Sequence, residues 1–131
     1  MPAKRTQIAT NVATTDQVSG PCRSVDGSLL ALLSTSSLMR LIEEVCVEAM
    51  RERIEADQCS VGGITHLRQL APVLLPKDVM VTAIFRLFDG EFYWFDVLAV
   101  DGVGPVASAS HARSVVDISG VEKQVLTDCN T

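Results

Sequence analysis

The first strong pattern in the chain is a set of apolar residues that recur every three or four positions, the spacing of an amphipathic α-helix. Charged side chains at Arg40, Glu44 and Glu48 fall on the opposite side of that helix. Four hydroxyl-bearing residues, 34–37, precede the pattern and offer several N-caps. The pattern therefore predicts a helix over about 35–55 with one wide buried face. Its apolar positions are Leu38, Met39, Leu41, Ile42, Val45, Cys46, Ala49 and Met50.

Glu43 does not lie with the other charged side chains of this helix. At about 100° per residue it falls between Met50 and Ile54, at the flank of the apolar face. An acid at such a position is partly shielded from water and is suited to proton transfer. The other interpretation is an edge acid that reaches solvent or pairs with an arginine. The helix pattern alone leaves both interpretations open.

After the helix the pattern changes to that of β-strands, and all the aromatic residues of the chain lie within one stretch, 85–95. An Asp-Gly pair divides this stretch and is typical of a two-residue hairpin turn. Such a turn would pair Leu87 with Phe92. It would also pair Phe85 with Trp94, so that large apolar side chains gather on both faces of the hairpin.

The order of these elements predicts a single domain over 1–131. A β-branched strand and a loop occupy 4–33, and the other sheet strands occupy about 59–118. The sheet has about five strands in all. The tail, 120–131, is expected to be loosely held. One long helix against one curled antiparallel sheet is an α+β fold. Because such a sheet has free edges, we expect a homodimer that hides one of them.

Composition and charge narrow the classes of function. At 131 residues, 47% of them hydrophobic, the chain can bury a core of its own. Its formal net charge of −5 argues against nucleic acid or an anionic membrane as the main partner. None of the four cysteines forms a C-x-x-C pair and only two histidines accompany them, so no metal site is expected. Reduced cysteines, with no run that fits a signal peptide or a membrane span, indicate a cytoplasmic protein.

Three stretches resemble those of the fluoroacetyl-CoA thioesterase-like family, whose members have the hotdog fold, a curled antiparallel sheet wrapped around one long helix. They are "STSSLMRLIEEVCVEAM", "SVGGITHLRQLAP" and "SASHARSVVDI". With the spacing of the Asp-Gly hairpin, the resemblance covers roughly 28–118. Members of the family hydrolyse acyl-CoA thioesters. The resemblance therefore implies a hotdog homodimer that acts on an acyl-CoA, with no cofactor beyond the coenzyme A of its substrate.

The resemblance also implies roles for individual residues. The family's catalytic threonine and glutamate match Thr35 and Glu43, and the glycine that lines its acyl pocket matches Gly62. We expect the adjacent Gly63 to line the same pocket. A threonine at a helix N-terminus would also lie among free backbone N–H groups that favour a developing negative charge. A plain N-cap is the simpler interpretation of Thr35, and both roles can hold at once.

The last matching stretch contributes His111 and Arg113 as candidate contacts for the substrate. His111 matches a histidine that recurs in the family, and it equally suits a structural role, hydrogen-bonded within the sheet. Arg113, with Arg68 and Lys77, is a candidate contact for the CoA phosphates. Each of the three also fits an ordinary surface charge.

The chain departs from the family at the catalytic histidine, whose position is taken by Gln69. His66 lies three residues earlier, and an odd offset in a strand puts two side chains on opposite faces. In this register Gln69 points into the site and His66 away from it. Glutamine can polarise a carbonyl or hold a water, but it cannot act as a general base or nucleophile. The chemistry would then centre on Glu43.

Three functions remain open at this point. The first is hydrolysis of a small or medium acyl-CoA thioester, which the retained Thr35 and Glu43 favour. The second is a non-catalytic hotdog module that binds an acyl-CoA or another small amphipathic molecule, which the missing histidine favours. The third, a hydratase or dehydratase of the same fold, is weaker, because no aspartate and histidine have a spacing suggestive of that site.

Overall fold

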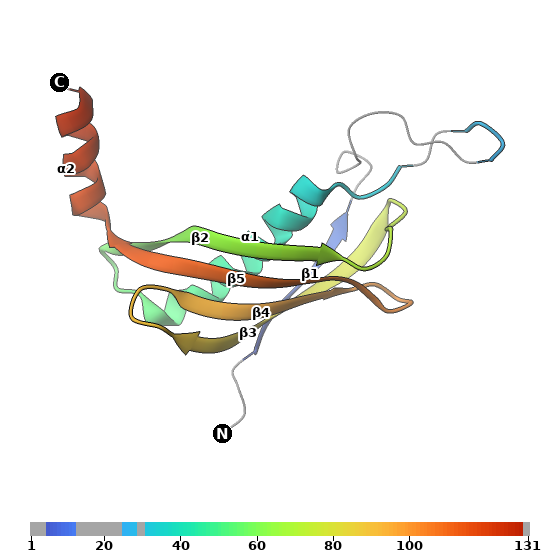
Figure 1. The fold of residues 1–131 in the computed structure, drawn as a ribbon, viewed down its shortest axis with the longest axis horizontal. Coiled ribbons are helices and arrows are strands. Elements are labelled where there is room, and N and C mark those ends of the chain that lie inside the picture. Colours follow the sequence, from blue (N-terminus) through green and yellow to red (C-terminus); the bar gives the residue numbers. More distant parts are fainter. Residues whose placement is uncertain (1–4, 13–24, 29–30, 130–131) are drawn as a thin grey trace.

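The computed structural model describes residues 5–12, 25–28 and 31–129, with side chains in all of these except 8–12 and 125–129. The loop predicted before the helix lies largely outside these residues. Within them the chain forms one long helix against a five-stranded antiparallel sheet, as the sequence predicts (Figure 1). No helix in this described part is long and apolar enough to cross a membrane.

The long helix, α1, spans Thr35–Met50 and continues into a single 3₁₀ turn, Arg51–Arg53. The hydroxyl of Ser34 caps its N-terminus by accepting a hydrogen bond from the backbone N–H of Ser37, at 3.1 Å. The predicted apolar positions are buried, apart from a half-buried methionine. The helix is shorter than predicted because the backbone becomes extended at Ile54.

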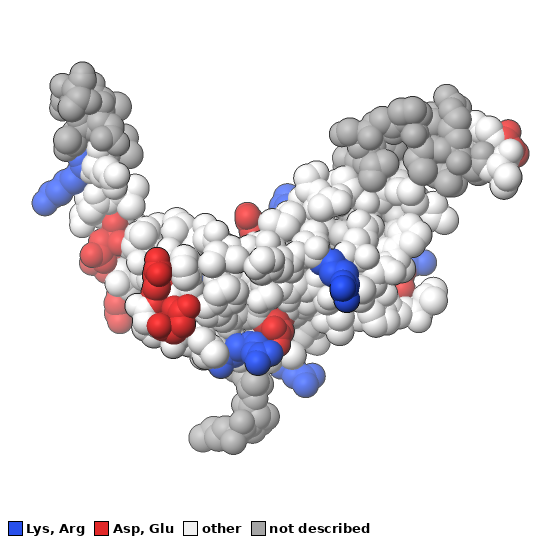
Figure 2. Space-filling view, in the orientation of Figure 1, with Lys and Arg blue, Asp and Glu red and all other residues white. Residues whose placement is uncertain are grey.

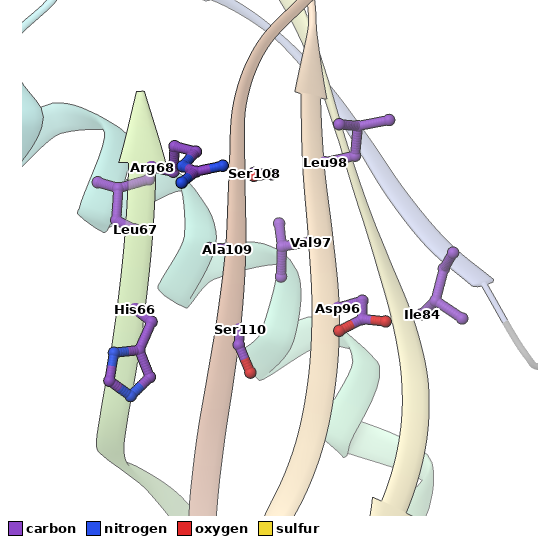
Figure 3. Close-up of a pocket in the computed structure, with 10 residues that line it drawn as sticks. All are labelled: His66, Leu67, Arg68, Ile84, Asp96, Val97, Leu98, Ser108, Ala109 and Ser110. Carbon is purple, nitrogen blue, oxygen red and sulfur yellow. The ribbon is translucent and has the colours of Figure 1, made fainter. Parts of the chain in front are cut away.

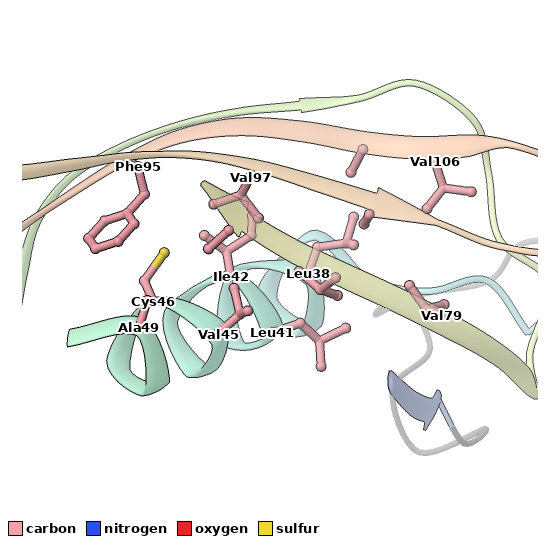
Figure 4. Close-up of a cluster of buried hydrophobic side chains, with 14 of the residues drawn as sticks. Leu38, Leu41, Ile42, Val45, Cys46, Ala49, Val79, Phe95, Val97 and Val106 are labelled. Atoms are coloured by element: carbon pink, nitrogen blue, oxygen red, sulfur yellow. The ribbon is translucent and has the colours of Figure 1, made fainter. Parts of the chain in front are cut away.

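The sheet has the strand order β1-β3-β4-β5-β2, and every neighbouring pair is antiparallel. One face of the sheet packs on α1, and the apolar side chains of helix and strands meet between them (Figure 4). In the part of the chain that the structure describes, β2 pairs with β5 alone, so its other edge is free. The strands are β1 Arg5–Val12, β2 Gln58–Gln69, β3 Lys77–Phe88, β4 Tyr93–Val100 and β5 Pro105–Asp117.

The hairpin between β3 and β4 has a different register from the predicted one. Leu87 pairs with Trp94, where the sequence pattern predicted Phe92. Phe85 pairs with Phe95, because the register shifts between Phe85 and Leu87. The predicted pairings of this hairpin were therefore wrong by two residues at the turn and by one beyond the shift.

The side chain of Asp89 is the physical reason for the longer loop. Its carboxylate accepts hydrogen bonds from the backbone N–H groups of Glu91, at 2.8 Å, and Phe92, at 2.7 Å. It also accepts one from the indole N–H of Trp94, at 2.8 Å. These contacts stabilise a four-residue connection in which Gly90 has a φ of +102°. They also hold the pKa of Asp89 below its usual value.

A second helix, α2, spans Ile118–Cys129, where the sequence analysis expected a loose tail. It leaves the end of β5 and projects away from the sheet (Figure 1). The backbone N–H of Ile118 donates to the carbonyl of Asp57, at 2.9 Å, and ties the start of the helix to the start of β2. Gly120, where the loose tail was expected to begin, is the third residue of this helix.

Candidate functional site

A β-bulge at Gly63 sets the directions in which the side chains of β2 point. The pairing of β2 with β5 runs from Gly62 opposite Arg113 to Ile64 opposite Ala112, so Gly63 has no partner in the ladder. As a result Gly62 and Thr65 lie on the same face of the sheet, although their offset is odd. Strict alternation counted back from Gln69, without the bulge, would place Gly63 on that face and not Gly62.

The register also settles the facing of Gln69 and His66. Gln69 pairs with Ala107, which is buried in the core between sheet and helix, so Gln69 belongs to the helix-facing side. His66 pairs with Ser110 and lies on the outer face, where both border an open hollow of about 640 Å³ (Figure 3). Charged side chains on this outer face are scattered and do not gather into a basic patch (Figure 2).

Four of the residues predicted for the site come together around Gly62. A side-chain carbon built at Gly62 would lie 3.4 Å from Nη1 of Arg113, 3.5 Å from Cε1 of His111 and 3.9 Å from Oε1 of Glu43. These groups come from α1, β2 and β5. The missing side chain of this glycine therefore leaves a small gap, the Gly62 gap, which a carboxylate, an imidazole and a guanidinium border.

Gly63 is not part of this gap. A side-chain carbon at Gly63 would overlap Cε1 of Phe92 and come within 3.0 Å of its Cζ. The glycine is needed because the Phe92 ring packs directly against the backbone. The structure therefore gives Gly63 a packing role, while its predicted contact with a substrate stays a prediction.

Arg113 is a buried cation, with 5% of its surface exposed. Its guanidinium donates from Nε to the hydroxyl of Ser60, at 2.9 Å, and from Nη2 to the carbonyl of Ser60, at 3.0 Å. Nη1 donates to Nε2 of His111, at 3.0 Å. Among the described residues no carboxylate pairs with it at 4 Å or less. Burial lowers the pKa of Arg113 from its usual value, and the nearby Glu43 is among the groups that oppose this shift.

His111 is almost completely buried, at 1% exposure, which agrees with the structural role considered for it. Its Nδ1 lies 2.6 Å from the hydroxyl oxygen of Thr65, on the adjacent strand. Burial, and then the positive charge of Arg113, lower the pKa of His111 to about 4. His111 is therefore neutral near pH 7. Cys46, close enough to Arg113 to feel its charge, is a protonated thiol there, because burial raises its pKa to about 12.

The other predicted catalytic residues lie away from the Gly62 gap within one chain. Thr35 is exposed at the first residue of α1, about 12 Å from Glu43 along the helix axis. Gln69 is exposed at the end of β2, about 20 Å along the strand from Gly62. Glu43 is itself exposed, so the described residues of its own chain do not supply the shielding that its place on the helix flank predicted.

Ser60 and Thr65 are the two polar residues of the cluster that the sequence analysis missed. Ser60 is two residues before Gly62 and shares its face, a signal that was available once Gly62 had been singled out. Thr65 lies four residues before Gln69 in a regular stretch of β2 and shares its face, so its place on the side of the site could be predicted from Gln69. Within the described residues no group of three His, Cys, Asp or Glu side chains is placed to hold a metal ion.

Comparisons with known proteins agree with this architecture. The family model for fluoroacetyl-CoA-specific thioesterases matches residues 14–119. A fluoroacetyl-CoA thioesterase from Streptantibioticus cattleyicolor is 31% identical over 97 residues, which is 72% of this chain and 68% of that protein. The match confirms the resemblance drawn from the three sequence stretches.

Solved structures confirm the hotdog fold. A hot-dog-like protein from Thermanaerovibrio acidaminovorans superposes with a TM-score of 0.81 at 25% identity, over 97% of this chain and 91% of that one. A fluoroacetyl-CoA thioesterase structure superposes with a TM-score of 0.81 at 24% identity, over 97% of this chain and 96% of that one, which supports the fold alone. With the family match above, these likenesses show that the chain is a hotdog protein belonging to the fluoroacetyl-CoA-specific thioesterase family.

Proposed function

We propose that this chain hydrolyses a small or medium acyl-CoA thioester, with Glu43 as the central acid-base group or nucleophile. Its relative from S. cattleyicolor is a thioesterase by name, which supports the reaction class. The observation that carries the proposal is the Gly62 gap, because the Glu43 carboxylate and the buried Arg113 guanidinium both lie within 4 Å of the place that a side-chain carbon would take there. A carbonyl in this gap would meet a nucleophile and a positive charge together.

The chemistry can follow either of two routes from Glu43. In the first, the carboxylate takes a proton from a water molecule, whose oxygen bonds to the thioester carbon. In the second, a carboxylate oxygen bonds to that carbon, and water then hydrolyses the resulting anhydride. Both routes break the carbon–sulfur bond, and the departing CoA thiolate takes up a proton. The products are a free acid and CoA.

Arg113 would steady the negative charge that develops on the thioester oxygen, because a guanidinium keeps its charge throughout such a reaction. His111 is not available as the base, since it is buried and the lone pair on its Nε2 already accepts a hydrogen bond from Arg113. Gln69 can hold a water or a carbonyl but transfers no proton. Thr35 would contribute its hydroxyl and the adjacent helix N-terminus.

A homodimer is part of the proposal, because Gln69 and Gly62 lie far apart within one chain. The free edge of β2 is suited to antiparallel pairing with a second copy. A two-fold axis near Thr65 and His66 would bring the partner's Gln69 to the Gly62 of this chain. The same contact would shield Glu43 from water.

The alternative function is a module that binds an acyl-CoA without turnover, and the glutamine at position 69 favours it. Free thiol release from a panel of short and medium acyl-CoAs, measured beside calorimetric binding of CoA, separates the two. Release that saturates with one acyl-CoA supports the hydrolase. CoA binding without any release, at protein concentrations above the dissociation constant, would support the module. Gain of activity in Gln69→His would support placing residue 69 in the site.

A further inference from the structure

The hydrogen bonds of Arg113 determine which nitrogen of His111 carries the proton. An arginine nitrogen only donates, so Nε2 of His111 must be the acceptor in the 3.0 Å contact with Nη1. A neutral imidazole then carries its proton on Nδ1, which donates to the hydroxyl of Thr65 across 2.6 Å. The other tautomer would set two N–H groups against each other at Arg113 and leave Nδ1 without a proton to donate.

Arg113 has N–H groups that its hydrogen bonds to Ser60 and His111 do not use. Its guanidinium has five N–H groups, and its bonds to Ser60 and His111 use one on each nitrogen. One N–H on Nη1 and one on Nη2 have no partner among the described residues. Nη1 is the guanidinium nitrogen nearest the gap, 3.4 Å from the position of the missing side chain.

We infer that Thr65 and His111 are positioning residues that hold the Arg113 guanidinium so that its remaining N–H groups bind the thioester oxygen. Thr65 accepts the hydrogen bond that fixes the tautomer of His111, and His111 offers the lone pair of Nε2 to Nη1 of Arg113. Ser60 accepts a hydrogen bond from Nε of the same guanidinium. The inference rests on the proposed thioester hydrolysis. It assigns the binding of the thioester oxygen to one hydrogen-bonded group, which exchanges no proton with the substrate. The group consists of Ser60, Thr65, His111 and Arg113.

This arrangement is suited to a transition state better than to a ground state. A buried guanidinium that is held by three hydrogen bonds does not need to reorganise when negative charge develops on the thioester oxygen. The groups that interact with His111 are the cation of Arg113, the hydroxyl of Thr65 and the backbone of Ile64, and the carboxylate of Glu43 lies near the same gap. A positive charge on His111 would remove the acceptor and repel Arg113.

Two matched pairs of variants test the positioning chain. Thr65→Val keeps the shape of the side chain but removes the acceptor, whereas Thr65→Ser keeps the hydroxyl. His111→Gln can place an amide oxygen near the position of Nε2, whereas His111→Leu cannot accept. We expect Thr65→Val and His111→Leu to lower kcat at least tenfold with little change in KM, and Thr65→Ser to stay within about threefold of wild type. His111→Gln should retain more activity than His111→Leu.

Nitrogen-15 NMR of the imidazole rings gives a readout that does not depend on turnover. We expect the protein with no substrate to show His111 with its proton on Nδ1, and Thr65→Val to gain the Nε2–H tautomer. A wild-type ring with its proton on Nε2, or unchanged kcat in both Thr65→Val and His111→Leu, would overturn the inference. If wild type releases no thiol from any acyl-CoA, the proposed hydrolysis fails, and the tautomer alone still decides whether the chain of hydrogen bonds exists.

Discussion

Arg113 donates from Nη1 to Nε2 of His111 across 3.0 Å, and the two residues lie two positions apart on β5, on the same face of the sheet. This contact joins a buried cation to a buried neutral ring next to Glu43. It explains how a positive charge is held at the Gly62 gap without a carboxylate bonded to it. The neighbouring acid is left free for chemistry.

Arg113→Lys is expected to reduce kcat by a factor of ten or more, because an ammonium cannot make the bonds to Ser60 and His111 together. Leaving a buried acceptor unpaired costs about 1–3 kcal/mol, so the free energy of unfolding should fall as well. Arg86→Lys, at an exposed ion pair with Asp96, is the matched control and should change neither quantity. Steady-state kinetics and denaturant unfolding measure both. A kcat equal to that of wild type in Arg113→Lys would contradict a catalytic role for the guanidinium of Arg113.

The buried His111 predicts a stability that rises as the pH increases from about 4 to about 6.5. Burial lowers its folded pKa to about 4 from an ordinary 6.5, so in this range the unfolded chain binds more protons than the folded one. The full effect is on the order of 3 kcal/mol, at 1.36 kcal/mol per pKa unit. Unfolding in denaturant at a series of pH values measures it.

His111→Gln should flatten this part of the pH profile, since an amide does not titrate. His66→Gln is the control, because His66 is exposed on the opposite face of the sheet. Equal slopes in the two variants would show that His111 is not the group responsible.

Alanine at the two neighbouring glycines should have different consequences. At Gly62 the added carbon would make ordinary contacts of 3.4 Å or more, so Gly62→Ala is expected to fold normally and to lose activity by filling the gap. At Gly63 the carbon would overlap Phe92, so Gly63→Ala should lose about 1–3 kcal/mol of stability. Thermal unfolding and kcat/KM of both variants separate the cases. Equal stability loss in both would contradict the described packing.

The proposed homodimer gives a prediction about the mass of the protein in solution. Pairing through the free edge of β2 predicts a mass about twice 14.1 kDa. Light scattering at micromolar concentration measures it. A monomeric mass would refute the dimer, and with it the explanation of how Gln69 reaches the Gly62 gap.

The sequence predicted those parts of the structure that repeat regularly. The apolar spacing from Leu38 to Met50 gave the buried face of α1, because helical periodicity does not depend on distant contacts. The offset between His66 and Gln69 gave their opposite facing, since no irregularity lies between them. Where one side chain or one extra residue changes the backbone, the pattern failed. The hydrogen bonds of Asp89 lengthened the hairpin, and the bulge at Gly63 changed which face Gly62 lies on relative to Gln69.

Glu43→Gln tests the central claim most directly, with Glu44→Gln as its control. Glu44 is the adjacent residue on α1 and forms an exposed ion pair with Arg40, at 2.9 Å. The two substitutions remove the same charge, but only one removes the carboxylate at the Gly62 gap. The measurement is the rate of thiol release from the acyl-CoA that wild type hydrolyses fastest. We predict that Glu43→Gln lowers kcat by on the order of 10²–10⁴-fold and that Glu44→Gln leaves it within about twofold. Equal rates in Glu43→Gln and wild type would contradict the account.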